Sequence, residues 1–180
     1  NGYLGLWMDG TDQWVALPAS NLGAGQSIIG MGDVNGDGCD DILINSNGVL
    51  GAWDISGIIN GTGKTPVWNS FGITIGSEWE VAGCADFDGN GKADIVLWRS
   101  NDGYIGTYMN CDVNDFRGIY PGASKSEWGI PGFGDFNGDG CDDVLVRNLG
   151  SGALGYWDGA DGFKWKEIGS GVDSTWAVIA

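Results

Sequence analysis

The stretch Asp33-Val-Asn-Gly-Asp37-Gly-Cys-Asp-Asp41 is followed at once by the aliphatic run Ile42-Leu43-Ile44, and this pattern occurs three times in the chain. Oxygen-bearing side chains stand at loop positions 1, 3, 5 and 9, with glycine at positions 4 and 6. Alternate residues can therefore point inward around a hard cation, while the glycines allow the tight turn. The other copies are Asp86-Phe-Asp88-Gly-Asn90-Gly-Lys-Ala-Asp94 before Ile95-Val96-Leu97, and Asp135-Phe-Asn137-Gly-Asp139-Gly-Cys-Asp-Asp143 before Val144-Leu145-Val146.

The ion expected in such loops is calcium, which accepts six to eight oxygen ligands and tolerates irregular geometry better than magnesium does. One copy alone would also suit an ordinary turn, since Asp, Asn and Gly are common turn residues. Three copies in register favour metal binding over a turn without metal. The sequence therefore predicts three calcium sites.

The residues after each loop exclude an EF-hand. An EF-hand needs a carboxylate at position 12 and a helix after it. Position 12 falls on Ile44, Leu97 and Val146, and the β-branched runs around them are typical of strands. Each loop is therefore expected to join two β-strands, with its ninth-position Asp at the start of the outgoing strand.

The loops mark a longer repeat of about fifty residues: Asp33 and Asp86 are 53 residues apart, and Asp86 and Asp135 are 49 apart. Other segments recur at the same interval, so each repeat contains four short β-like segments joined by turns. Such repeats are the sequence sign of β-propeller blades. The recurring segments are Gly2–Trp7, Gly48–Trp53, Gly103–Tyr108 and Gly152–Trp157, then Trp14–Leu17, Trp68–Phe71, Phe116–Ile119 and Trp165–Ile168, with Trp79 and Trp128 each seven residues before a loop.

Repeated aromatic residues favour a packing role between blades over a ligand-binding role. Exposed rings could still stack on sugars, because aromatic faces are apolar; Tyr3, Tyr104 and Tyr120 are the less repetitive candidates. The aligned positions are Trp7, Trp53, Tyr108 and Trp157, and Trp14, Trp68, Phe116 and Trp165.

These loops and the Gly-x-Leu-Gly-x-Trp motif closely resemble the FG-GAP/VCBS-type repeats, which include the calcium-carrying blades of integrin α-subunit propellers and many bacterial surface and secreted proteins. In that family the loop joins the first and second strands of a blade. The resemblance implies backbone carbonyl ligands at position 7, from Cys39, Lys92 and Cys141. It implies side-chain ligands at Asp33, Asn35, Asp37 and Asp41, at Asp86, Asp88, Asn90 and Asp94, and at Asp135, Asn137, Asp139 and Asp143.

The expected fold is all-β: a propeller segment of about 3.5 four-stranded antiparallel blades that begins and ends within a blade. Three alternatives stay open: a piece of a larger propeller, a small ring completed by the chain ends, or self-association through exposed strand edges. The expected boundaries are a partial blade at 1–19, blades at about 27–71, 79–121 and 128–168, and the first strand of a next blade at 174–180.

Composition agrees with an extracellular or cell-surface module. With 24 acidic and 8 basic residues the net charge is −16, which argues against nucleic acid and anionic membrane as partners. Nine acidic residues are candidate ligands, and three Ca²⁺ would bring the charge to about −10. No apolar run approaches eighteen residues, so no membrane insertion is expected.

The four cysteines suit an oxidising compartment but allow three pairings. The topology of the resembling family makes Cys111–Cys141 feasible between neighbouring blades, which leaves Cys39–Cys84. The alternative is that all four are free, partly buried thiols.

Nothing in the sequence favours catalysis. The chain has no histidine, which excludes a Ser-His-Asp triad, a Cys-His pair and a His-ligated zinc site within it. The Asp-Asp pairs at 40–41 and 142–143 could suggest glycoside hydrolysis, but the calcium loops explain them more simply. The sequence therefore predicts a secreted, calcium-binding, non-catalytic scaffold or cell-adhesion module for a protein or glycan ligand; the alternatives are a carbohydrate-binding accessory domain of a secreted polysaccharide-active enzyme and a catalytic propeller.

Overall fold

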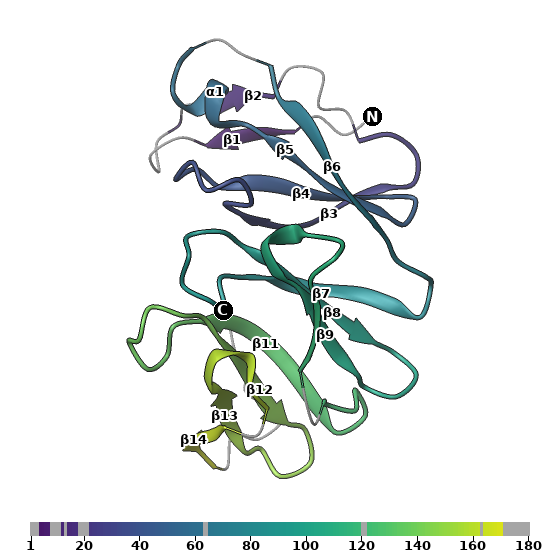
Figure 1. The fold of residues 1–180 in the computed structure, drawn as a ribbon, viewed down its shortest axis with the longest axis vertical. Helices are drawn as coiled ribbons and strands as arrows, with labels where there is room; N and C mark the ends of the chain where they lie inside the picture. The colour runs from purple at the N-terminus through teal and green to yellow at the C-terminus, as the bar shows by residue number, and fades with distance from the viewer. Residues whose placement is uncertain are drawn as a thin grey trace. The chain divides into compact units, whose positions relative to one another are not determined.

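The computed structural model describes residues 4–7, 12, 14–17, 22–62, 65–119, 122–162 and 164–170. Most of these residues lie in antiparallel strands and the turns that join them (Figure 1). The chain divides into two compact units, Asn1–Thr74 and Ile75–Ala180. No helix within the described ranges is long and apolar enough to cross a membrane.

The first unit holds one two-stranded and one four-stranded sheet. Strands β1 (Gly5–Trp7) and β2 (Trp14–Ala16) pair as an antiparallel hairpin. The four-stranded sheet has its strands in chain order, and a short helix, α1 (Ser56–Ile59), follows its third strand. These strands are β3 (Gln26–Gly32), β4 (Asp41–Ser46), β5 (Val49–Asp54) and β6 (Val67–Thr74).

The second unit holds two four-stranded sheets, and the first strands of the two sheets, β7 and β11, contact each other. A 3₁₀ turn follows the third strand of each sheet: η1 (Met109–Cys111) and η2 (Asp158–Ala160). The first sheet is β7 (Trp79–Ala85), β8 (Asp94–Arg99), β9 (Ile105–Tyr108) and β10 (Phe116–Ile119). The second is β11 (Trp128–Gly134), β12 (Asp143–Asn148), β13 (Leu154–Trp157) and β14 (Trp165–Gly169).

Each four-stranded sheet is an up-and-down meander with the topology of a propeller blade, which confirms the predicted all-β blade architecture. The same irregularity recurs in all three: the pairing of the first two strands shifts at Ile28/Gly30, Val81/Gly83 and Gly129/Gly132. A bulge at this place bends the first strand and increases its twist. The strand expected at 174–180 lies outside the described residues.

The aliphatic runs after the acidic loops form the second strands, which are the most buried strands of the blades. Ile44, Val96 and Val146 are fully buried. In the second unit Val96, Trp98 and Val146 belong to one apolar cluster, and the Trp98 indole N–H donates to the Ala123 carbonyl oxygen at 2.7 Å. Because these strands are covered on both faces, they are apolar at successive positions and do not alternate with polar residues.

Of the repeated aromatic residues of the fourth strands, Trp14, Trp68 and Phe116 are exposed and do not fill the core between blades, so that expectation is wrong for these three. Phe116 is 40% exposed, and Trp14 and Trp68 are similarly exposed. Trp165, in contrast, is partly buried and packs against the core cluster of the second unit. Each ring lies over a glycine of the neighbouring third strand, where an added Cβ would collide with the ring. The glycines so covered are Gly5, Gly51, Gly106 and Gly155, under Trp14, Trp68, Phe116 and Trp165.

The aligned aromatic residues that end the Gly-x-Leu-Gly-x-Trp segments differ in burial. Trp157 is buried, as expected for core packing, whereas Trp7 is largely exposed. The contacts of the fourth-strand rings explain why the last residue of the Gly-x-Leu-Gly motif is glycine. It leaves room for an aromatic ring from the next strand of the same blade.

All four cysteines are free thiols, so the disulfides Cys111–Cys141 and Cys39–Cys84 are not formed and the alternative of free thiols holds. Cys111 is buried, and its thiol contacts the Ala93 carbonyl oxygen at 3.3 Å. Burial raises the pKa of Cys84 to about 12, which keeps that thiol protonated.

Candidate functional site: three acidic loops

The acidic loops connect the first and second strands of the three blades, β3 to β4, β7 to β8 and β11 to β12. Both glycines of each loop have positive φ; at position 6 the values are +84° for Gly38, +82° for Gly91 and +90° for Gly140. A side chain at these positions would strain the backbone, which accounts for glycine at positions 4 and 6 of every copy.

The first aspartate of each loop accepts hydrogen bonds from backbone N–H groups inside its own loop. Asp33 Oδ1 accepts from Gly36 at 2.6 Å, and Asp33 Oδ2 accepts from Gly38 at 2.7 Å. Asp135 accepts equivalent bonds from Gly138 and Gly140, and Asp86 accepts from Asn90 and Gly91. Burial tends to raise the pKa of Asp33, but its backbone hydrogen bonds outweigh this and lower it. At Asp135, bonds led by that from Gly140 lower the pKa. The first aspartate thus stabilises the turn by accepting hydrogen bonds from the backbone of its own loop.

Positions 3, 5 and 7 form a chain of short-range bonds. In the first loop the Asn35 amide oxygen accepts from the Asp37 N–H at 2.8 Å, and Asp37 Oδ1 accepts from the Cys39 N–H at 2.9 Å. Asn137, Asp139 and Cys141 repeat this pattern. In the second loop Asn90 accepts from the Lys92 N–H, while Asp88 is exposed. All nine side chains at positions 1, 3 and 5 are therefore on the loop surface or turned toward loop amides.

The ninth-position aspartates are buried and have a different role. Asp94 Oδ2 accepts from the Phe87 N–H at 2.9 Å, and its Oδ1 accepts from the Asn110 N–H at 2.6 Å. Asp143 makes the same pair of bonds to the loop N–H of Phe136 and to Gly159 in η2. Each carboxylate therefore ties the first-to-second loop to the third-to-fourth turn of its blade.

The first blade lacks one of these bonds. Asp41 Oδ2 accepts from the Val34 N–H at 3.2 Å, but Oδ1 is buried and has no hydrogen-bond partner among the described residues. The residue sixteen positions later, which donates in the other two blades, is Gly57, and it lies within α1. Burial is the main cause that raises the pKa of Asp41 to about 6.

The second and third loops are joined to each other. The Asp86 N–H donates to Asp142 Oδ2 at 2.8 Å, and the Asp142 N–H donates to the Asp86 carbonyl oxygen at 2.8 Å. Burial and the nearby charge of Asp139, with smaller effects from Asp86 and Asp88, raise the pKa of the Cys141 thiol. The charges of the second loop therefore act on a side chain of the third loop.

The donor set fits a hard cation, since each loop offers only carboxylate, amide and carbonyl oxygens. In the described part of the chain, however, no group of three or more acidic or cysteine side chains converges as a metal site. Most of the candidate oxygens bond to loop amides. Among the oxygens of the three buried ninth-position aspartates, Asp41 Oδ1 is the one without a hydrogen-bond partner in the described residues. A buried carboxylate oxygen without a partner is costly. A cation would supply that missing partner.

A family model described as FG-GAP-like repeat matches residues 33–97 and 86–146, which together make up more than half of the 180-residue chain. The chain belongs to the FG-GAP-like repeat family. This confirms the resemblance inferred from the loop motif. FG-GAP repeats are typical of extracellular adhesion or scaffold modules and are generally non-catalytic. Neither curated proteins nor solved structures gave a match.

Sequence reasoning missed the partners of the acidic loops. Asn110 and Gly159 each lie sixteen residues after a ninth-position Asp, and that shared interval was the available signal. The repeated Asp-Asp pair included Asp142, but no pattern in the sequence pointed to Asp86 as its partner, and the second FG-GAP loop has Ala93 at the equivalent position.

Proposed function

We propose that this chain is an extracellular calcium-binding propeller module that acts as a non-catalytic scaffold or adhesion domain for a protein or glycan ligand. The observation that carries the proposal is the threefold FG-GAP loop with an all-oxygen donor set. The buried, unpartnered Asp41 Oδ1 supports it independently.

Each proposed ion would be held by the side chains at loop positions 1, 3, 5 and 9 and the carbonyl at position 7. Calcium would supply positive charge where three carboxylates lie within nine residues of chain. Without it, mutual repulsion of these carboxylates opposes the folded turn. The ion is therefore structural in this proposal: it stabilises the loop that connects two strands of each blade.

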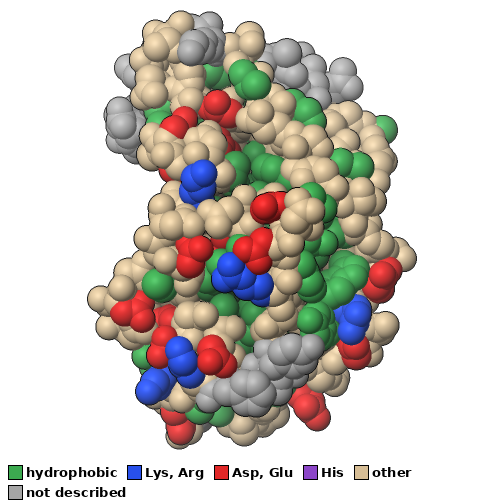
Figure 2. All heavy atoms as spheres, in the orientation of Figure 1, with side chains coloured by type: hydrophobic (Ala, Val, Ile, Leu, Met, Phe, Trp, Pro, Cys, Tyr) green, Lys and Arg blue, Asp and Glu red, His purple; other side chains and the backbone are tan. Residues whose placement is uncertain are grey.

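A surface location outside the cell suits this role, because calcium is abundant there and the FG-GAP family is typical of that setting. Acidic side chains lie at several places on the face shown in Figure 2, interspersed with uncharged atoms. A strongly acidic surface opposes binding to nucleic acid and to anionic membranes. The ligand is therefore expected to be a protein or a glycan.

Thermal unfolding with and without a calcium chelator tests the proposal. Removal of calcium should lower the melting temperature by many degrees, calcium should restore it, and magnesium should do so poorly. The loop variant Asp33→Asn should reduce the calcium-dependent rise, whereas Asp112→Asn, in an exposed turn outside the loops, should keep it. An unchanged melting temperature after chelation would contradict a structural role for calcium.

A further inference from the structure

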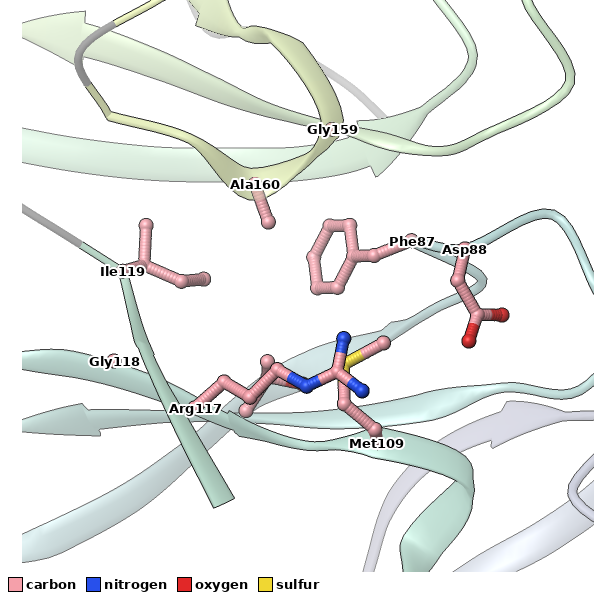
Figure 3. A pocket seen from close by; sticks show the side chains of 9 residues that line it. Phe87, Asp88, Met109, Arg117, Gly118, Ile119, Gly159 and Ala160 are labelled. Atoms are coloured by element: carbon pink, nitrogen blue, oxygen red, sulfur yellow. The ribbon is translucent and has the colours of Figure 1, made fainter. Parts of the chain in front are cut away.

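A cavity of about 150 Å³ lies between strands β9 and β10 of the second blade and the η2 turn of the third. Its apolar walls come from Phe87, Met109, Ile119 and Ala160. Figure 3 shows the side chains of Phe87 and Ile119 on either side of this space, with Ala160 pointing toward it from η2. All of these residues belong to the unit Ile75–Ala180.

Thr107 lines the same cavity and is 2% exposed, yet its hydroxyl has no hydrogen-bond partner in the described part of the chain. A buried hydroxyl without a partner costs free energy, so its retention in a cavity wall requires an explanation. The valine side chain has nearly the same shape and would avoid this cost. A ligand that exchanges a hydrogen bond with the Thr107 hydroxyl supplies the missing partner.

Two charged side chains add polar groups to the same cavity. Arg117 bonds to Asp115 through Nε at 2.9 Å and Nη2 at 2.8 Å, which leaves Nη1 able to donate to a ligand. Asp88 contributes carboxylate oxygens that can accept. The cavity therefore combines an aromatic wall with a hydroxyl, a guanidinium and a carboxylate.

The size and chemistry of this cavity define the ligand class. A cavity of about 150 Å³ can hold one six-membered ring. A purely apolar ring would leave the Thr107 hydroxyl unpaired, whereas a pyranose has hydroxyls that pair with all three polar groups and C–H faces that pack on Phe87. The net charge of −16 disfavours acidic sugars.

We propose that the cavity bounded by Phe87, Thr107, Arg117 and Ala160 binds a neutral pyranose, as the terminal residue of a glycan. This assignment rests on the proposed interaction function, for which it names the ligand class, but it does not require that calcium be the bound ion. Water alone in the cavity is the competing outcome.

The test is a titration of the ¹⁵N-labelled chain with neutral monosaccharides (glucose, galactose, mannose and N-acetylglucosamine), followed by amide chemical shifts. A single sugar has few atoms, so binding in the millimolar range is expected. At least one sugar should shift the amides of Thr107, Gly118 and Gly159. The absence of shifts at these amides for every sugar at tens of millimolar would overturn the assignment.

Two variants with matched controls locate the site. Thr107→Val and Arg117→Gln should each weaken binding by about five- to tenfold, the value of one hydrogen bond. Thr74→Val, an exposed threonine on β6, should not weaken it. Arg99→Gln should not either, because Arg99 forms the same kind of bidentate pair with Asp102 but packs on Trp79.

If Thr107 had a structural role, Thr107→Val would lower the melting temperature in the absence of sugar. The proposal predicts the opposite. Without sugar, Thr107→Val should melt no lower than the wild type, because it removes an unpaired buried hydroxyl. Equal sugar affinity of all four variants would overturn the proposal. The calcium-dependent melting shift, measured on the same samples, reports separately on the loops, so that failure of one proposal is distinguishable from failure of the other.

Discussion

Asp94 Oδ1 accepts a hydrogen bond of 2.6 Å from the backbone N–H of Asn110, sixteen residues later in the chain. The same carboxylate accepts from the Phe87 N–H, so one fully buried side chain fixes two connections at one end of the blade. Asp143 repeats the arrangement with Phe136 and Gly159. The ninth aspartate of these FG-GAP loops is therefore a structural residue even before any ion is considered.

Asp94→Asn and Asp143→Asn should each lower the free energy of unfolding by about 2–3 kcal/mol, because the new NH₂ group would face a buried N–H donor. Chemical denaturation of calcium-depleted protein measures the loss. Asp40→Asn, an exposed aspartate beside the ninth position of the first loop, is the control and should change little. Equal stability of Asp94→Asn and Asp40→Asn would contradict the structural role.

Part of the pH dependence of the calcium-free protein should come from Asp41, since burial also raises the pKa of Asp94 to about 6. The pKa of Asp41 is about 6 in the folded chain and 3.8 in the unfolded reference, so the folded state holds the proton more firmly. The destabilisation from this charge is absent below about pH 4 and complete above about pH 6. Stability should therefore fall as the pH rises through this window, and Asp41→Asn should reduce the fall.

Asp33→Asn should change the pH dependence of stability in the opposite direction to Asp41→Asn, although both residues lie in the same loop. The folded-state pKa of Asp33 is lowered, so its carboxylate contributes stability above the unfolded pKa that is lost as the pH falls. Its removal should make the fall in stability with rising pH steeper. Melting temperatures between pH 4 and pH 7 give the slope for the wild type and for each variant, and a change in slope of the same sign for both variants relative to the wild type would refute this account.

Gly106→Ala should destabilise the chain by about 1–3 kcal/mol, since the new methyl group would collide with the Phe116 ring. Gly169→Ala is the matched control: this glycine also lies in a strand, but nothing lies within 4 Å of its added Cβ. Phe116→Leu in the same chain should recover part of the loss at Gly106. Denaturation of the single and double variants measures this coupling.

Much of this fold could be predicted from local sequence. The loop formula, the aliphatic runs and the recurrence of about fifty residues identified the three blades because each blade repeats the same short-range signals. Helix α1 was not predicted, since Ser56–Ile59 is too short to show helical periodicity. The ring of Phe116 over Gly106 could not be assigned either, because the pattern alone does not distinguish packing within a blade from packing between blades.

The partners of the loops were less accessible to sequence reasoning. The bond from Gly159 to Asp143 and the one from Asp86 to Asp142 depend on how separate segments approach in space. The cavity lined by Thr107 was even less predictable from the sequence, because its walls come from two blades. The absence of disulfides likewise depends on three-dimensional placement, because an even number of cysteines fits both outcomes.

The thiols give a direct chemical check. Alkylation of the unreduced, denatured chain should add four labels, one for each free cysteine. In the native protein Cys84 and Cys111 should react slowly, because Cys111 is buried and the pKa of Cys84 is raised to about 12. Mass spectrometry counts the labels, and two unlabelled cysteines in the denatured, unreduced chain would show a disulfide that this structure does not contain.

Calorimetric titration of the calcium-depleted chain with Ca²⁺ tests the central claim most directly. Three ions should bind per chain, one for each FG-GAP loop, and Asp33→Asn, Asp86→Asn and Asp135→Asn should each remove or weaken one of them. Magnesium should bind much more weakly. Binding of fewer than two calcium ions per folded chain would contradict the account.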